Sequence, residues 1–341
     1  MGRKLSFGIR LFCSLSSGVY FFMKLLPQRK KVIFLSRQGN TPSIDFKLLR
    51  DEMEKLQPDY KFVMKCRSVA ESSSAMLRYV PAMLGQMFHI ATARLVILDS
   101  YSFPISILTH KPGLIVVQLW HALGIMKKYG FSVIDTVEGR NKEVAELLHM
   151  HRGYTHILAS SPACVSATLV AFGYAPDACS DNRKTLQGVL IGALPRVDYL
   201  LDREARDITR AKIYETYSQL KERKVILYAP TFRRSGDAVR RCTEQLIEAV
   251  LEANSRGGNF ALVIKRHFLQ DRLEKSLGLQ PLGTSFGRES YIQERCILYD
   301  CTFSAARLAM IAEACITDYS ASAYEFMMLE KPTYFYSLDL E

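Results

Sequence analysis

His121 follows the apolar run 113–119 and Trp120, and it is the first candidate in this sequence for proton transfer. The run predicts a strand, and an imidazole just beyond a strand titrates near neutrality, where it can act as a general base. An isolated histidine in this position is more commonly structural, so both interpretations stay open. Lys127 and Lys128 follow in the next loop, where they either hold phosphate or form a solvated face.

A second group of polar side chains follows the predicted strand 225–228. It consists of the Thr231 hydroxyl and the guanidinium groups of Arg233 and Arg234. Arginine suits phosphate because its planar fork donates two parallel hydrogen bonds. An ordinary polar loop has the same composition, so the residues by themselves do not choose between a phosphate site and a loop.

Three potential cations, Lys265, Arg266 and His267, follow the predicted strand 261–264. They form either a basic surface patch or a cluster that neutralises a diphosphate.

Asp318, Ser320 and Ser322 follow the predicted strand 315–317. Ser322 and Glu325 have the spacing of a capping box, which predicts a helix that begins at Ser322. The start of such a helix directs free backbone N–H groups and a positive dipole end toward an anion. A well-capped helix without a ligand satisfies the same pattern, and the two interpretations are compatible.

These segments are positioned by alternating β-rich and helical runs. A helix is predicted over 44–56 with Ser43 as its N-cap, and another over 73–93. Continuous apolar strands between helices predict parallel sheets covered on both faces, whose ligands bind beyond the carboxyl ends of the strands. We therefore predict an α/β protein with two Rossmann-like domains, residues 31–200 and 201–341, linked by a charged helical segment over 198–223.

The first thirty residues form a separate segment. Leu11–Leu26 is apolar but short for a membrane span, and it contains Lys24. Residues 1–30 are therefore predicted to form a basic amphipathic helix in a membrane interface, which Arg29 and Lys30 would hold against anionic lipid. The alternative is a helix that packs on the protein's own core.

The bulk composition sets limits on function. The chain has 341 residues with 48% apolar and 23% charged residues, which excludes a disordered protein, and its net charge of +11 favours anionic partners. Eight cysteines contain no CxxC pair, which favours a reducing cytosol and gives no zinc site. No nucleic-acid-binding motif is present, so nucleic acid is not an expected partner.

Taken in order, these segments resemble the CDP-glycerol glycerophosphotransferase family, the polymerases and primases of teichoic-acid-type polymers. The matching segments are 119–121 with Gly124 and Lys127, 191–198, 226–233, 264–267, and 316–320 with Glu325, Lys331 and Pro332. The chain departs from the family pattern at Ala122, Phe268 and Ala321. It also ends at Glu341, where family members usually continue, so we expect it to lack their terminal helices.

The resemblance implies a glycosyltransferase-B-like architecture with a cleft between two domains. It implies a CDP-polyol donor such as CDP-glycerol, a lipid-linked acceptor, release of CMP, no cofactor, and a peripheral position at the cytoplasmic face of the plasma membrane. We expect His121 and His267 to be catalytic. The expected substrate contacts are Lys127, Thr231, Arg233, Lys265, Asp318, Ser320 and Ser322. Two alternatives remain: a nucleotide-sugar glycosyltransferase of the same fold, and a non-catalytic basic protein of the membrane surface.

Overall fold

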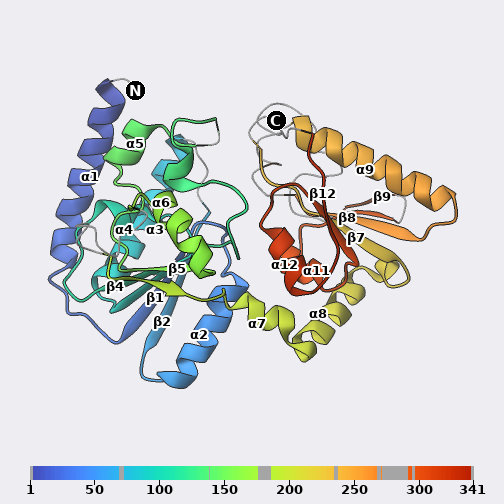
Figure 1. Cartoon of the computed structure of the whole chain (residues 1–341). Coiled ribbons are helices and arrows are strands. Elements are labelled where there is room, and N and C mark those ends of the chain that lie inside the picture. Colours follow the sequence, from blue (N-terminus) through green and yellow to red (C-terminus); the bar gives the residue numbers. More distant parts are fainter. Residues whose placement is uncertain are drawn as a thin grey trace. The chain divides into compact units, whose positions relative to one another are not determined.

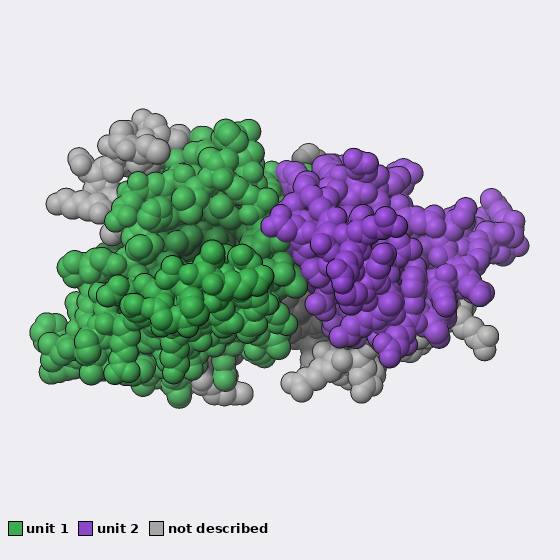
Figure 2. Space-filling model, turned by 90° about the horizontal axis from the view of Figure 1, so that it is seen from below, with its two compact units in different colours: residues 1–195 green, residues 196–341 purple. Residues whose placement is uncertain are grey.

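The computed structural model describes residues 3–68, 73–137, 139–175, 186–233, 237–266, 270, 291–293 and 296–338. The chain divides into two compact units, residues 1–195 and 196–341, which Figure 2 colours separately. The boundary lies after Pro195, slightly earlier than the expected one at residue 200.

Unit 1 contains a parallel sheet with the strand order β2-β1-β3-β4-β5-β6 (Figure 1). Its strands are β1 (Lys31–Ser36), β2 (Lys61–Cys66), β3 (Leu95–Leu98), β4 (Ile115–Gln118), β5 (His156–Ala159) and β6 (Gly188–Ile191). Its α-helices are α1 (Arg3–Met23), α2 (Ile44–Leu56), α3 (Ser73–Ala91), α4 (Phe103–Ile107), α5 (Lys142–Leu147) and α6 (Val165–Ala171). Two 3₁₀ turns, η1 (Gly130–Val133) and η2 (Pro162–Cys164), lie between them. The predicted parallel α/β arrangement is confirmed here.

The strands of unit 1 bury both faces because alternate side chains point to opposite sides of a sheet. In β1, Ile33 and Leu35 join the large core that α3, α4 and α6 cover. Phe34 points to the other face, where its ring lies 5.1 Å from that of Phe46 on α2. The predicted N-cap of α2 is confirmed, since the Ser43 hydroxyl accepts a hydrogen bond from the Phe46 backbone N–H.

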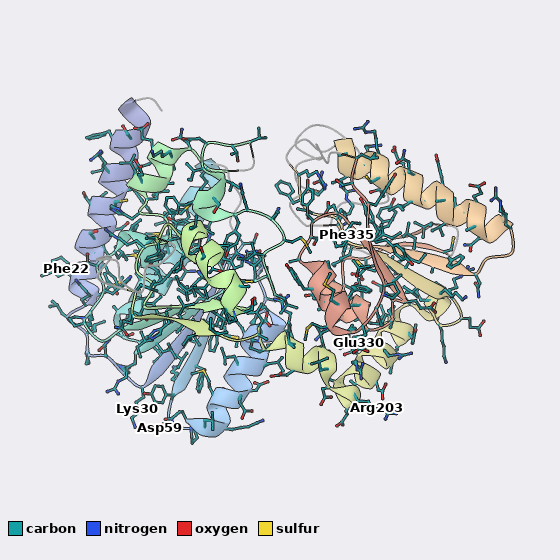
Figure 3. All side chains as sticks on the ribbon, in the orientation of Figure 1. Phe22, Lys30, Asp59, Arg203, Glu330 and Phe335 are labelled. Atoms are coloured by element: carbon teal, nitrogen blue, oxygen red, sulfur yellow. The ribbon has the colours of Figure 1, made fainter. Side chains whose placement is uncertain are left out.

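Helix α1 has two different faces. On one face Phe12, Cys13 and Tyr20 pack against the core of unit 1, and the Tyr20 hydroxyl lies 2.9 Å from His110 Nδ1. The other face carries large apolar side chains in solvent, among them Phe22, which points away from the unit in Figure 3. One side of α1 therefore packs on the protein, as the alternative expected, and the other side exposes an apolar surface; a position in a membrane interface stays a prediction.

Unit 2 has a second sheet with the order β12-β11-β7-β8-β10-β9, parallel except for β9 against β10. Its strands are β7 (Lys224–Tyr228), β8 (Phe260–Ile264), β9 (Tyr291–Gln293), β10 (Ile297–Tyr299), β11 (Ala314–Thr317) and β12 (Thr333–Phe335). Its helices are α7 (Arg196–Leu201), α8 (Arg203–Thr216), η3 (Ser218–Leu220), α9 (Asp237–Ser255), α11 (Ala305–Ala309) and α12 (Ser322–Met328).

Strand β7 shows how this second sheet is covered. Val225 and Leu227 face the core formed with α8, α11 and α12, whereas Ile226 and Tyr228 face the core formed with α9. The helices in Figure 1 follow this division, with α9 on one side of the sheet and α11 and α12 on the other. Both faces of the central strands are therefore buried from solvent, as the continuous apolar runs predicted.

The segment expected to be one linking helix, 198–223, is instead divided into α7, α8 and η3. The break falls at Asp202, whose carboxylate accepts a hydrogen bond from the Ala205 backbone N–H and caps α8. Aspartate favours such a cap over the interior of a helix because its short side chain competes for backbone N–H groups. The single-helix prediction was wrong for this reason.

Candidate functional site

In unit 1 the candidate site lies at the carboxyl ends of β1, β3 and β4. The register aligns Leu35 with Leu98 and Leu98 with Gln118, so the loops that follow these neighbouring strands begin side by side. His121 lies in one of these loops, half-buried. Its Nδ1 atom is 3.0 Å from the backbone oxygen of Asp99 and 3.2 Å from Nε2 of Gln38.

The Asp99 carbonyl decides which nitrogen of the His121 ring carries the proton. A carbonyl oxygen only accepts hydrogen bonds, so its close approach to Nδ1 requires an N–H there. The lone pair of the neutral ring then lies on Nε2, which becomes the basic nitrogen. The Gln38 amide is compatible with this tautomer once its oxygen and nitrogen are exchanged. The oxygen then accepts a hydrogen bond from the same Nδ1–H.

Trp120, immediately before His121, has an unusual backbone conformation. Its φ angle is 63°, in the left-handed region that non-glycine residues rarely adopt. Its N–H donates to Oε1 of Gln118 at 2.9 Å, and its ring stacks on Tyr129 with centroids 4.7 Å apart. Backbone strain of this kind costs of order 1–3 kcal/mol and persists where surrounding contacts hold it, which commonly happens at functional sites.

A small pocket opens beside this turn, lined by Trp120, Tyr129, Ser160 and Thr168 among others. Lys127 lies farther along the same loop and is exposed. The loop after β4 thus contains the His121 imidazole, the stacked rings of Trp120 and Tyr129, and the exposed Lys127.

In unit 2 the corresponding strand ends carry a buried ion pair. Asp318 follows β11, and its carboxylate accepts hydrogen bonds from the Thr231 backbone N–H at 3.0 Å and from the Thr231 hydroxyl at 2.7 Å. The same carboxylate binds the guanidinium group of Arg233. The three residues are only 4%, 8% and 6% exposed, in the order Asp318, Thr231, Arg233.

Arg233 makes several further contacts inside unit 2. Its Nη1 donates to the Thr231 carbonyl at 3.2 Å, its Nη2 donates to the Ser337 hydroxyl at 3.1 Å, and its guanidinium lies 4.7 Å from the Tyr319 ring centroid. These contacts direct the arginine toward the protein itself. The geometry therefore favours a positioning role for Arg233 and Asp318 in the loop after β7, whereas the sequence suggested direct contact with substrate.

Lys265, after β8, is held by Asp300, which follows the neighbouring strand β10. Its Nζ lies 3.0 Å from the Asp300 carboxylate and 3.2 Å from the Asp300 carbonyl. That carboxylate also accepts from the Tyr217 hydroxyl at 2.7 Å and from the Phe303 backbone N–H. Sequence reasoning missed Asp300 and Gln38, although both come within two residues of a strand's carboxyl end, which is the signal that located the other residues.

The capping box predicted at Ser322 and Glu325 was wrong. Ala321 occupies the N-cap position of α12 without a side-chain cap, and the Ser320 hydroxyl accepts a hydrogen bond from the Ser322 backbone N–H at 3.3 Å. Glu325 instead accepts a hydrogen bond from Arg196, with 3.0 Å between Nη1 and Oε1. Ser320 and Ser322 nevertheless lie together, half-buried, on the turn that follows Asp318.

His267, the second expected catalytic residue, lies outside the described residues, as does Arg234. Within the part of the chain that the structure describes, no three side chains of His, Cys, Asp or Glu gather closely enough to hold a metal ion. The described candidates therefore form two groups, His121 with Lys127 in unit 1, and the residues around Asp318 and Lys265 in unit 2.

Comparison with known proteins supplies the family. Residues 19–341 match the model of the CDP-glycerol:poly(glycerophosphate) glycerophosphotransferase family. The chain belongs to this family. Because the match begins inside α1, most of that helix precedes the part that the family model describes.

Two curated relatives of this chain are primases with different polyols in their names. The teichoic acid ribitol-phosphate primase of Bacillus spizizenii (strain W23) is 26% identical over 320 residues, covering 93% of this chain and 75% of the primase. The teichoic acid glycerol-phosphate primase of Bacillus subtilis (strain 168) is 24% identical over 343 residues, covering 96% of this chain and 78% of the primase.

Solved structures show the shared fold. The wall teichoic acid polymerase TagF, in a form soaked with CDPG, superposes with a TM-score of 0.64 at 15% identity, over 98% of this chain and 80% of that one. The UDP-GlcNAc 2-epimerase of Methanocaldococcus jannaschii gives a TM-score of 0.51 at 13% identity, over 89% of this chain and 82% of that one. The expected glycosyltransferase-B-like fold is confirmed.

Proposed function

We propose that this protein transfers a polyol phosphate from a CDP-polyol to a hydroxyl of a lipid-linked acceptor, with release of CMP, in the synthesis of a teichoic-acid-type polymer. Membership of the glycerophosphotransferase family and the names of the relatives support the reaction class. The observation that carries the mechanism is the Asp99 carbonyl on His121 Nδ1, which leaves Nε2 as a base.

In this mechanism the acceptor hydroxyl oxygen attacks the phosphorus that bears the polyol. The new P–O bond forms as the bond from that phosphorus to the CMP oxygen breaks, and Nε2 of His121 takes the hydroxyl proton. General-base catalysis of this kind contributes roughly 10²–10⁴-fold in rate. We keep His267 as a second catalytic group on the strength of the resemblance.

The proposal divides the polar residues of unit 2 by their burial. Ser320 and Ser322, half-buried on the turn after β11, are proposed to donate hydrogen bonds to donor phosphate oxygens. Thr231, Arg233 and Asp318 hold the adjoining loop through their buried network. Lys127 and Lys265 are retained as electrostatic partners of the phosphates, and the reaction is proposed to need no metal or cofactor.

The donor we propose is CDP-glycerol, which the family description names. The similarity to a ribitol-phosphate primase makes CDP-ribitol the alternative. Release of CMP should be measured with each donor at equal concentration, with a lipid-linked saccharide as acceptor. A kcat/KM at least tenfold higher for CDP-ribitol would overturn the choice of glycerol and leave the reaction class intact.

His121→Asn tests the base directly, and His149→Asn is its matched control. His149 is an exposed histidine of the same unit, and its φ of 46° suits asparagine. We expect CMP release to fall at least 100-fold in the first variant and to stay within twofold in the second. Near-normal turnover by a folded His121→Asn protein would refute the mechanism.

We also propose that the protein lies peripherally on the cytoplasmic face of the plasma membrane through α1. The stretch Ser6–Met23 is apolar enough to cross a membrane, and 11% of it is buried. Phe7, Leu15 and Phe22 are 67%, 64% and 69% exposed, and no acidic residue precedes Asp45, which suits anionic lipid. The opposite face of α1 is occupied by the protein's own core, so a position along the surface suits it better than a span.

Co-sedimentation with vesicles tests this placement. Binding should be strong with phosphatidylglycerol vesicles, weak with phosphatidylcholine, and at least tenfold weaker after Phe7→Asp with Leu15→Asp. The control is Ile208→Asp, because Ile208 is 62% exposed on α8 and far from α1 in the sequence. Equal binding by both variants would contradict a membrane-facing α1.

A further inference from the structure

Gln118, the last residue of β4, is the most completely buried polar side chain near His121. It is 0% exposed, and both ends of its amide are bonded to backbone. Oε1 accepts from the Trp120 N–H at 2.9 Å, and Nε2 donates to the Ser100 carbonyl at 3.2 Å. A buried amide that lost either partner would leave a polar group unsatisfied, which is costly away from water.

The orientation of this amide is fixed by its partners. A backbone N–H can only donate and a backbone carbonyl can only accept, so the oxygen must face Trp120 and the nitrogen must face Ser100. Turning the amide by 180° would place like groups against each other at both ends. Gln118 therefore has one stable arrangement, and in it the amide oxygen holds the N–H of Trp120 in its left-handed conformation.

Both backbone groups held by Gln118 adjoin the groups that set His121. Trp120 directly precedes His121, and Ser100 directly follows Asp99, whose carbonyl accepts from His121 Nδ1. One side chain thus connects the turn that carries the imidazole with the turn that fixes its tautomer. We infer that Gln118 is a positioning residue for the polyol-phosphate transfer, an inference that rests on the proposed role of His121 as base.

A second layer of buried groups supports Gln118. The Tyr154 hydroxyl contacts the Gln118 side chain and lies 2.9 Å from His151 Nδ1. Burial raises the pKa of Tyr154 and lowers the pKa of His151 to about 3, so both groups remain neutral throughout the physiological range. The hydrogen bonds from Gln118 through Tyr154 to His151 therefore keep their direction as the pH changes.

Loss of the two Gln118 hydrogen bonds, to Trp120 and to Ser100, should lower kcat more than it weakens binding of the donor. Without the bond to Gln118, Trp120 can leave its strained conformation, and the His121 ring then loses its alignment with the Asp99 carbonyl. A misplacement of about 1 Å at a reacting group can cost on the order of 10²-fold in rate. The expected signature is a 10- to 100-fold fall in kcat with KM for the CDP-polyol unchanged within threefold.

Gln118→Met tests the inference because methionine matches the length of glutamine and forms neither bond. Thr155→Val is the control: the buried Thr155 hydroxyl also bonds to backbone in this sheet, to the Val116 N–H at 2.8 Å and the Val116 carbonyl at 3.0 Å. We expect the control to lose stability and keep kcat. An unchanged kcat in folded Gln118→Met, or an equal fall in both variants, would overturn the inference.

A readout independent of activity is the tautomer of His121, followed by ¹⁵N NMR of histidine-labelled protein and assigned with His121→Asn. The wild type should show the proton on Nδ1, and Gln118→Met should show a mixture. If Gln118→Met does not fold, Gln118→Glu replaces it, since it keeps the acceptor for Trp120 and loses the donor to Ser100. A wild type that releases no CMP from either CDP-polyol would reject the proposed function, and a fully active His121→Asn would reject the role of His121 as base. An inactive His121→Asn beside a fully active Gln118 variant would reject only this inference.

Discussion

Replacing Asp318 with asparagine should destabilise unit 2 far more than the change in volume suggests. Asparagine has nearly the same shape, but it removes the negative charge that faces the guanidinium of Arg233, which is 6% exposed. An arginine left buried without its partner charge costs about 3–5 kcal/mol. For a unit of 146 residues (196–341) that corresponds to a fall in Tm of roughly 6–20 °C in the transition that contains unit 2.

The assay is thermal and urea unfolding of the wild type, Asp318→Asn and a surface control. Glu52→Gln is suitable because it removes the ion pair with Lys55, whose side chains are 60% and 72% exposed and which should contribute at most about 1 kcal/mol. The double variant Asp318→Asn with Arg233→Met removes both charges and keeps an amide oxygen as acceptor for Thr231. It should be more stable than Asp318→Asn, since replacing a buried pair together avoids the unpaired charge.

A Tm for Asp318→Asn within about 2 °C of the control would refute the view that this pair is buried and coupled. A double variant that is less stable than the sum of the single changes would refute it equally. In either case Arg233 would return to being a candidate for direct contact with donor phosphate.

Three further predictions concern other parts of the molecule. Burial lowers the pKa of Lys31 to about 8, and its Nζ contacts the Thr92 hydroxyl, His89 and the Phe88 ring. The unfolded chain therefore binds more protons than the folded one between pH 8 and about 10.5. The free energy of unfolding should rise with pH across that window. Lys31→Met should exceed the wild type in urea stability at pH 7 by more than it does at pH 9.5, and a constant difference would contradict this. Ser43→Ala should cost about 0.5–2 kcal/mol in urea unfolding through loss of the α2 cap. Dialysis against EDTA should leave at least half of the CMP release; a loss restored by Mg²⁺ would show that the reaction needs a metal.

The strands that carry the candidate residues, and the points at which they end, could be predicted from the sequence. Apolar runs of three to seven residues between helical segments located every strand that precedes His121, Thr231, Lys265 and Asp318. Since ligands bind beyond the carboxyl ends of parallel strands, the residues that follow these runs were the ones to inspect. The strand-end rule therefore selected the loops from which the candidate site is built.

The partners within those loops could not be predicted, because they depend on strands that are not consecutive in the chain. Strand β11 lies next to β7 in the sheet, although β8, β9 and β10 come between them in the sequence. This neighbour relation places Asp318 against Arg233, 85 residues away, in a buried ion pair that the sequence did not indicate. A crossover of this kind leaves no local pattern in the sequence.

The failed capping box has the same physical origin. Ser322 and Glu325 satisfy the spacing rule, yet Glu325 pairs with Arg196, 129 residues earlier, and Ser320 supplies the acceptor for the Ser322 N–H. A local motif predicts local bonding only where no stronger partner is brought near by the fold. The half-buried guanidinium of Arg196 is such a partner, because charge-assisted hydrogen bonds are roughly twice as strong as neutral ones.

Exposure separates the two kinds of residue that the strand-end rule collects. Gln118 and Asp318, at 0% and 4% exposure, have their polar atoms bonded to the protein's own loops. His121, Ser320 and Ser322 are half-buried at the same strand ends. Only a group that retains some exposure can reach a substrate without breaking a buried bond, so the half-buried residues are the ones to assign to chemistry. The fully buried residues beside them are then expected to act through position, as the Gln118 variants and the Asp318 variants test separately in the two units.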